Sequence, residues 1–151
     1  MQARMKNPAM LIPGAIEALQ AAAGLSKTAG VPERTLGLVH MRVSQINGCA
    51  VCLEGHRSIA GKLDESEQRT FAVAVWRDAP FFDDAERAAL ALAEAVTLLS
   101  ERGVPDEVWS EAARRFDERA LAALILHIAM VNVWNRLNVS TRQVAGEVKW
   151  G

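Results

Sequence analysis

The sequence predicts an all-α fold, a single-domain bundle of about six to seven helices. Apolar residues recur at helical spacing through most of the chain, and Pro, Gly and Asp interrupt the pattern where helices would start and end. No segment has strand-like alternation of comparable strength. Half of the 151 residues are hydrophobic, which is enough for one buried core. No repeat, low-complexity segment or linker divides the chain, so we expect one domain over residues 1–151.

Seven helical segments follow from the apolar spacing and from the residues at their ends. Pro32 suits the first position of the second helix, and Asn47 suits the N-cap of the third. Asp64 with Glu67 has the form of a capping box for the fourth. In the sixth, we expect Trp109 to face inward. The expected helices cover roughly residues 13–23, 32–46, 48–61, 64–76, 84–102, 106–116 and 118–138.

The last expected helix, residues 118–138, is apolar around almost its whole circumference. A helix with so little polar surface is buried. Several other amphipathic helices compete for the core of this short chain, so we expect another subunit to share part of that apolar surface. The sequence therefore predicts a homo-oligomer.

Both cysteines of the chain and one of its three histidines lie close together after the turn at Asn47-Gly48. With Asn47 as the N-cap, Cys49 falls in the first turn of a helix. At about 100° per residue, Cys49, Cys52 and His56 lie within an arc of roughly 60°. Their side chains can therefore meet on one face of that helix.

This spacing suits thiol chemistry. Cys49 and Cys52 lie one turn apart at a helix start, which is the geometry of redox-active dithiols. His56 follows Cys52 by one turn, where its imidazole can take the thiol proton or stabilise the thiolate. The positive end of the helix also favours a thiolate. These three residues are the candidate catalytic groups.

Two other interpretations of the same residues stay open. Cysteines on a helix also occur as small buried hydrophobic side chains. The Cys-x2-Cys-x3-His spacing offers three zinc ligands, but a closed structural site needs a fourth. His40 and His127 are the remaining histidines, and there is no second cysteine pair. We therefore expect neither a metal nor a cofactor.

Charge and composition restrict the classes of partner. The net charge is −1 and the pI is near 6.3, so electrostatics favour neither nucleic acid nor an anionic membrane. No apolar run reaches the length of a membrane span, and Pro8, Pro13 and Gly14 interrupt the run that a signal peptide would need. A single CxxC suits a reducing compartment. We expect a cytoplasmic protein.

The segment MRVSQINGCAVC, residues 41–52, followed by His56, closely resembles the alkylhydroperoxidase D core of the carboxymuconolactone decarboxylase-like superfamily. Residues 85–94 and 133–137 look like the second half of the same family. The resemblance covers most of the chain from about residue 32 to residue 142.

The resemblance implies an all-α alkylhydroperoxidase D-like fold, a homotrimer or homohexamer, and a thiol peroxidase in antioxidant defence. Carried over residue by residue, Cys52 becomes the peroxidatic thiol, Cys49 the resolving thiol that meets the reductant, and His56 the group that handles the proton. The implied partners are a hydroperoxide substrate and a dithiol reductant or redox partner protein. Decarboxylase members lack the cysteine pair, which disfavours lactone decarboxylation.

The chain departs from the family pattern at Gly37, twelve residues before Cys49. The family's enzymes carry a glutamate there that relays protons through the histidine. Val51 stands where the characterised peroxidase has a histidine. His40, one turn after Gly37, could replace the missing carboxylate, although a histidine on a mostly apolar helix is also typical of a core or interface. We expect His127, on the buried last helix, to be structural.

Two functions of different classes are consistent with these expectations. The first is an enzyme, either a thiol peroxidase or a dithiol-disulfide oxidoreductase whose peroxidase activity is weak because Gly37 lacks a carboxylate. The second is a non-enzymatic oligomeric redox sensor or dithiol-disulfide exchange module. A catalyst turns over with a reductant, whereas a sensor oxidises once and changes shape.

Overall fold

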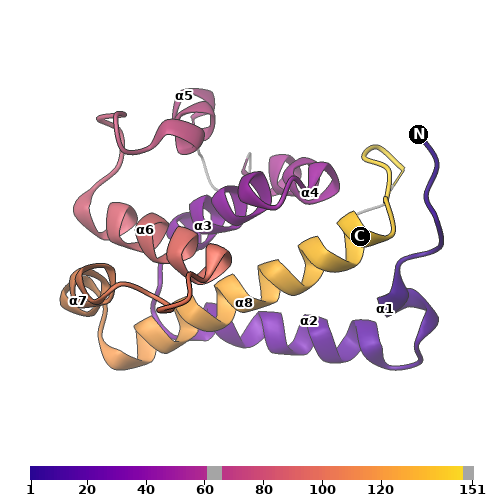
Figure 1. Ribbon diagram of the computed structural model, residues 1–151, viewed down its shortest axis with the longest axis horizontal. Helices are drawn as coiled ribbons and strands as arrows, with labels where there is room; N and C mark the ends of the chain where they lie inside the picture. The colour runs from indigo at the N-terminus through magenta and orange to yellow at the C-terminus, as the bar shows by residue number, and fades with distance from the viewer. Residues whose placement is uncertain (61–65, 148–151) are drawn as a thin grey trace.

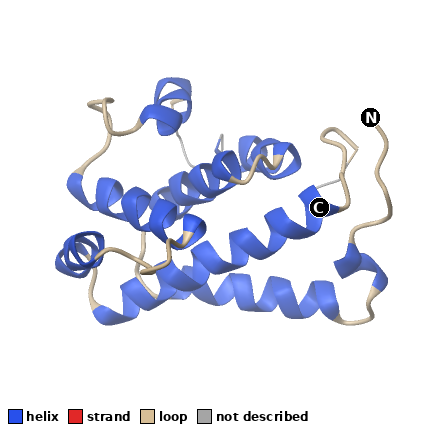
Figure 2. Ribbon diagram, viewed as in Figure 1, coloured by secondary structure: helices blue, strands red, loops and turns tan. Residues whose placement is uncertain are grey.

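The computed structural model describes residues 1–60 and 66–147, and in this part of the chain the named elements are all helices, joined by loops (Figures 1 and 2). The all-α prediction is confirmed. The seven expected segments correspond to α2–α8, and the structure has one further short helix, α1, that was not expected. The elements are α1 (Pro8–Leu11), α2 (Ala15–Leu25), the 3₁₀ helix η1 (Ser26–Thr28), α3 (Glu33–Ile46), α4 (Ala50–Ala60), α5 (Glu67–Ala72), the 3₁₀ helix η2 (Val73–Val75), α6 (Asp84–Leu98), α7 (Asp106–Arg115) and α8 (Glu118–Ser140).

The longest of these helices, α8, runs through the middle of the bundle, with α2 along one side and α3 and α6 packed against it (Figure 1). Its Leu124 and Ile128 are fully buried, whereas Leu126 and Val139 are exposed. Among the described residues, α8 is the one helix whose length and composition would allow it to span a membrane. Half of its apolar window is buried inside the bundle.

Two apolar clusters hold the helices together. The larger one joins α3, α6, α7 and α8 around residues such as Val39 and Leu92, and the second packs α5 and η2 onto α3 and α6 around Val73 and Leu90. All four side chains are fully buried, and each such burial stabilises the fold by about 1.5–3 kcal/mol. The C-terminal half of α3, which leads into the cysteine segment, is therefore firmly anchored.

Away from the cysteines, the start of α5 and the orientation of α7 bear on two expectations from the sequence. The capping box expected at Asp64 lies outside the described residues, and Ser66 caps α5 by accepting a hydrogen bond from the Arg69 backbone N–H. The expectation that Trp109 faces inward is wrong, because its side chain is 45% exposed. Ala112 is the fully buried residue of α7, and Val108, one turn before it on the same face, packs against the larger apolar cluster, so Trp109 lies at the edge of this buried face.

The N-terminal segment packs on the C-terminal end of α8. The backbone N–H of Arg4 donates to the carbonyl of Thr141 at 2.9 Å, and Gln143 Nε2 donates to the carbonyl of Met5 at 2.7 Å. These contacts join residues at opposite ends of the sequence. They bring Asn7, which precedes α1, next to the part of α8 that faces the cysteines.

Candidate functional site

The turn between α3 and α4 sets the position of both cysteines. Gly48 adopts φ +66°, a left-handed conformation that favours glycine, and the Cys49 N–H then donates to the carbonyl of Ser44 at 2.9 Å. The expectation that Asn47 caps the next helix is wrong, because Asn47 ends α3 and α4 begins later, at Ala50. Cys49 takes the capping role, since its sulfur accepts the Cys52 backbone N–H at 3.3 Å.

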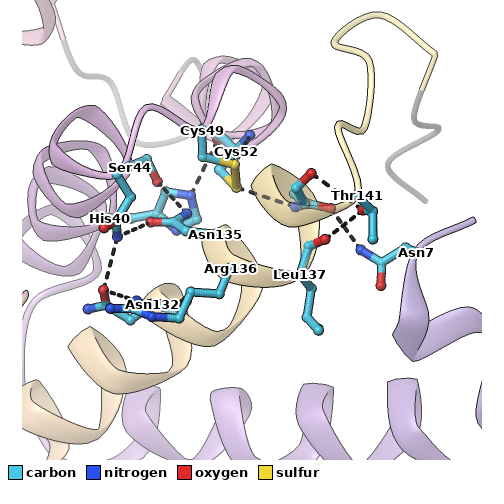
Figure 3. Close-up of a disulfide and its surroundings, with 12 residues drawn as sticks. Asn7, His40, Ser44, Cys49, Cys52, Asn132, Asn135, Arg136, Leu137 and Thr141 are labelled. Atoms are coloured by element: carbon cyan, nitrogen blue, oxygen red, sulfur yellow. Dashed lines mark hydrogen bonds between the residues drawn. A yellow bond between two sulfur atoms is a disulfide. The ribbon is translucent and has the colours of Figure 1, made fainter. Parts of the chain in front are cut away.

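Cys49 and Cys52 form a disulfide, with their Cα atoms 5.3 Å apart (Figure 3). The structure thus brings together the two thiols that the spacing placed on one helix face. Both are almost completely buried, at 2% and 3% exposure, and Val51 between them is buried as well. A substrate or reductant must therefore enter through a local opening of the surrounding structure.

The third residue of the predicted set, His56, lies beside His40. The two imidazole rings stack with centroids 5.5 Å apart and an angle of 23° between their planes. His40 Nε2 also lies 3.3 Å from the Cys52 carbonyl oxygen. The two histidines proposed from the sequence are therefore neighbours, and His40 connects them to the backbone of the CxxC segment.

A pocket of about 130 Å³ lies between η1, α3, α4 and α8, and we call it the histidine pocket. All three histidines contribute to its wall. His127, expected to be structural, does make structural contacts: its Nε2 lies 3.1 Å from the Leu36 carbonyl oxygen and its Nδ1 3.2 Å from Ser26 Oγ. Its position in the pocket was not foreseen. The lining residues are Lys27, Glu33, Leu36, Gly37, His40, His56 and His127.

The imidazoles of the histidine pocket are neutral at pH 7. Burial, reinforced by the neighbouring His40, lowers the pKa of His56 to about 4. Burial and then His40 likewise lower the pKa of His127 to about 4. Burial also lowers the pKa of His40, more than its hydrogen bond to Cys52 raises it. In the disulfide state His56 is thus a potential proton acceptor and carries no positive charge.

Gly37 lines the histidine pocket, so the position at which the family pattern has a glutamate does face His40 and His56. The pocket's carboxylate comes instead from Glu33, one turn earlier on α3 and exposed. The spacing in the sequence was a signal for this residue: Glu33 lies four positions before Gly37, and positions four apart on a helix share a face.

A network of amides anchors the turn before the cysteines to α8. Asn135 is fully buried; its Nδ2 donates to Ser44 Oγ at 3.1 Å, and its Oδ1 accepts from Asn47 Nδ2 at 2.9 Å. The Asn47 amide also donates to Asn132 Oδ1 at 2.9 Å. Asn47 therefore holds α3 against α8 instead of capping α4.

A second set of amides reaches the disulfide itself, and we call it the amide chain. Asn138 Nδ2 donates to Cys52 Sγ at 3.4 Å, Asn7 Nδ2 donates to Asn138 Oδ1 at 2.7 Å, and the Ala9 backbone N–H donates to Asn7 Oδ1 at 2.9 Å. Sequence reasoning missed these residues. The signal was the placement of asparagines three residues apart on an otherwise apolar helix, since buried amides require partners.

The cluster around the disulfide does not supply an obvious ligand set for zinc. Within residues 1–60 and 66–147, no group of three or more His, Cys, Asp or Glu side chains is arranged to hold a metal ion. Cys49 and Cys52 are bonded to each other, and His40 and His56 are stacked. The chemistry that this arrangement can perform with its own atoms is thiol-disulfide exchange and proton transfer.

Comparison with known proteins places this geometry in a family. The profile of the carboxymuconolactone decarboxylase family matches residues 13–95. The uncharacterized protein YdfG of Bacillus subtilis is 37% identical over 115 residues, which cover 76% of this chain and 78% of YdfG.

Solved structures share the fold. One is a protein of unknown function from Agrobacterium tumefaciens, suggested to be the antioxidant defence protein AhpD, with a TM-score of 0.89, 31% identity, and coverage of 98% of this chain and 100% of that one. The debrominase Bmp8, solved with 2,3,4-tribromopyrrole, has a TM-score of 0.79 at 22% identity, with coverage of 91% of this chain and 74% of Bmp8. This chain therefore belongs to the carboxymuconolactone decarboxylase family and has its alkylhydroperoxidase D-like fold.

Proposed function

We propose that the protein is a thiol peroxidase that reduces hydroperoxides through a Cys49–Cys52 disulfide cycle and serves in antioxidant defence. The observation that carries the proposal is the disulfide itself, formed within a CxxC beside the stacked pair His40 and His56. Membership of a family that contains AhpD-like proteins supports it, and the debrominase Bmp8 supports enzymatic activity in this fold.

The proposed cycle begins with both thiols reduced. The Cys52 thiolate attacks one oxygen of the hydroperoxide, so that an S–O bond forms, the O–O bond breaks, and the departing alkoxide takes a proton to leave as an alcohol. The Cys49 thiol loses its proton and attacks the sulfenic sulfur, forming the S–S bond while the S–O bond breaks, and the departing hydroxide takes up a proton to leave as water. A dithiol reductant reopens the disulfide by exchange and is itself oxidised.

Proton transfer in this cycle falls to the histidines. A neutral His56 accepts the proton of the Cys52 thiol, and the resulting imidazolium can donate it to the departing oxygen. His40 is stacked on His56 and serves as the second group of the relay. Because Gly37 supplies no carboxylate, His56 is a weak base and we expect peroxide reduction to be slow.

Stoichiometric oxidation tests the proposal most directly. Reduced protein is mixed with one equivalent of hydrogen peroxide or an organic hydroperoxide and examined by mass spectrometry. The wild type should lose two hydrogens as the disulfide forms, and Cys49→Ser should instead gain one oxygen, on Cys52. Cys52→Ser should be unreactive. Retained reactivity in that variant would reverse the roles of the two cysteines.

The runner-up is a redox sensor or dithiol-disulfide exchange module that oxidises once. The near-complete burial of both sulfurs and the missing carboxylate at position 37 favour it. Trials of several dithiol reductants under excess peroxide separate the two functions. A peroxidase consumes many equivalents of peroxide with at least one reductant, whereas a sensor consumes one equivalent and stops.

We also propose a homotrimer or homohexamer in the cytoplasm. Leu126 and Val139 of α8 are 37% and 44% exposed, so this core helix retains apolar surface that a second copy would cover. The single CxxC supports a reducing compartment. Light scattering at micromolar concentration is the test, and a clean monomer would remove the proposed assembly.

A further inference from the structure

We propose that Asn138 is a catalytic residue whose amide N–H stabilises the Cys52 thiolate, and that Asn7 is the positioning residue that orients this amide. The consequence for peroxide reduction rests on the proposed function, in which Cys52 attacks. The stabilisation of the Cys52 thiolate is independent of that function, and it can be measured without any peroxide.

The contact to sulfur is buried and specific. Asn138 is 7% exposed, and its Nδ2 lies 3.4 Å from Cys52 Sγ, within hydrogen-bond distance for a sulfur acceptor. A disulfide sulfur is a weak acceptor. When the bond is reduced and Cys52 loses its proton, the same donor faces a full negative charge, and hydrogen bonds to ionised groups are about twice as strong as neutral ones. Asn138 therefore favours the thiolate over both the thiol and the disulfide.

The direction of the Asn138 amide is set by the backbone of α1. The Ala9 N–H can only donate, so the group of Asn7 that faces it must be the carbonyl Oδ1, at 2.9 Å. The Asn7 NH₂ group is then left to donate to Asn138 Oδ1 at 2.7 Å. This contact in turn leaves the Asn138 NH₂ group facing Cys52. The backbone at the start of α1 thus determines that the NH₂ group of Asn138, and not its carbonyl oxygen, faces Cys52 Sγ.

The two sulfurs compete for the negative charge. Cys49 Sγ accepts the Cys52 backbone N–H at the positive end of α4, which alone would make Cys49 the more acidic thiol. The Asn138 contact is the opposing influence on Cys52. A neutral His56 can accept a proton from the thiol, but it supplies no positive charge that would stabilise the thiolate once formed. The amide chain therefore stabilises the negative charge on Cys52 after the proton has left.

The decisive measurement is the pKa of Cys52 in a Cys49→Ser background, obtained from the rate of iodoacetamide alkylation as a function of pH. Asn138→Leu replaces the amide by an apolar group of similar shape. It should raise the pKa of Cys52 by about one unit or more, so that alkylation at neutral pH slows by about tenfold or more. Thr141→Val is the matched control, because the buried Thr141 hydroxyl donates to the backbone carbonyls of Leu137 and Asn138 and accepts from Gln143, so its loss loosens the same turn without removing the Asn138 side-chain amide. The control should leave the pKa of Cys52 unchanged.

A second variant tests the orientation without altering the residue that touches sulfur. In Asn7→Asp, one carboxylate oxygen still accepts from the Ala9 N–H and the other faces Asn138. The Asn138 amide should then rotate, so that its NH₂ group donates to the new carboxylate and its carbonyl oxygen faces Cys52. The pKa of Cys52 should rise in this variant, and less in Asn7→Ala, which leaves the amide free to keep its donor on the sulfur.

The outcomes separate this inference from the proposed function. An unchanged Cys52 pKa in both Asn138→Leu and folded Asn7→Asp overturns the inference, whatever the peroxide assays give. Equal shifts in Asn138→Leu and Thr141→Val also overturn it, because they indicate a general disturbance of α8. Raised pKa values in a protein that never turns over peroxide uphold the inference and reject the peroxidase.

Discussion

The disulfide has two neighbouring environments that differ in what they can do for a thiol. In Figure 3, His40 lies on one side of the disulfide and Asn7 on the other. The histidine pocket holds groups whose protonation can change, whereas the amide chain holds groups whose donors and acceptors are fixed by covalent structure. The histidines can therefore move a proton, while the amides can only stabilise a charge once it has formed.

The two environments also differ in completeness. Each amide of the chain from Ala9 to Cys52 both donates and accepts, so the chain is satisfied from end to end. The histidine pocket lacks the carboxylate that the family pattern has at Gly37. Its carboxylate, Glu33, is exposed and lies one turn before position 37. The hydrogen bonds around the sulfur are therefore complete, whereas the acid-base groups of the pocket depart from the family pattern. Four predictions test whether this contrast governs reactivity.

The largest effect is expected from removing His56. His56→Ala deletes the group that accepts the Cys52 proton, and loss of general base catalysis slows a reaction by about 10²- to 10⁴-fold. Stopped-flow measurement of thiol loss with a hydroperoxide provides the rate. His127→Gln is the control, because His127 lines the same pocket but contacts Leu36 and Ser26. Equal rates in wild type and His56→Ala would show that His56 does not accept the Cys52 proton.

Restoring the carboxylate should have the next largest effect. Gly37→Glu would place a negative charge beside His40 and His56, raise the pKa of both imidazoles, and speed Cys52 oxidation by roughly 10- to 100-fold with the pH profile shifted downward. If His40 already replaces the glutamate, Gly37→Glu will do little and His40→Ala will slow the reaction. No change in either variant would contradict both forms of the relay. Unfolding must be measured separately, because replacing a glycine inside a helix stabilises it by up to about 1 kcal/mol.

The parts of this protein that could be predicted from sequence are those set by nearby residues. Apolar periodicity and end residues located seven helices, and the spacing of Cys49, Cys52 and His56 located the dithiol. The start of α4 was misplaced, because the left-handed Gly48 delays the helix and lets a cysteine sulfur take the cap that Asn47 was expected to supply.

The missed parts depend on contacts between distant segments. The short α1 is capped by Asn7, whose side chain donates a hydrogen bond to Asn138 near the other end of the chain, a pairing that local periodicity cannot indicate. His127 reaches the histidine pocket because α8 crosses α3 beside His40. Tertiary packing of α8 thus supplies the residues that local patterns left out.

The third prediction concerns acid stability and tests the neutral state of the histidine pocket. The folded pKa values of His56 and His127 are about 4, below the ordinary 6.5, so the unfolded chain binds more protons between these values. Their contribution is fully present above pH 6.5 and is lost as pH falls toward 4, on the order of 3 kcal/mol for each residue. Urea unfolding at several pH values measures this slope. His127→Gln should flatten it, and an unchanged slope would mean that His127 is not buried in its neutral form.

The smallest expected effect separates the anchoring amides from the reactive one. Ser44→Ala removes the hydroxyl that accepts from Asn135 Nδ2, which leaves one buried N–H without that partner and costs about 1–2 kcal/mol of unfolding free energy. The Ser44 backbone carbonyl that accepts from Cys49 is retained, so the turn keeps its shape. Denaturant unfolding should show the loss, while iodoacetamide titration should find the pKa of Cys52 unchanged. A raised pKa in Ser44→Ala would mean that any loosening of α8 against α3 weakens the thiolate, and the contrast between a general anchor and a specific donor at Asn138 would fail.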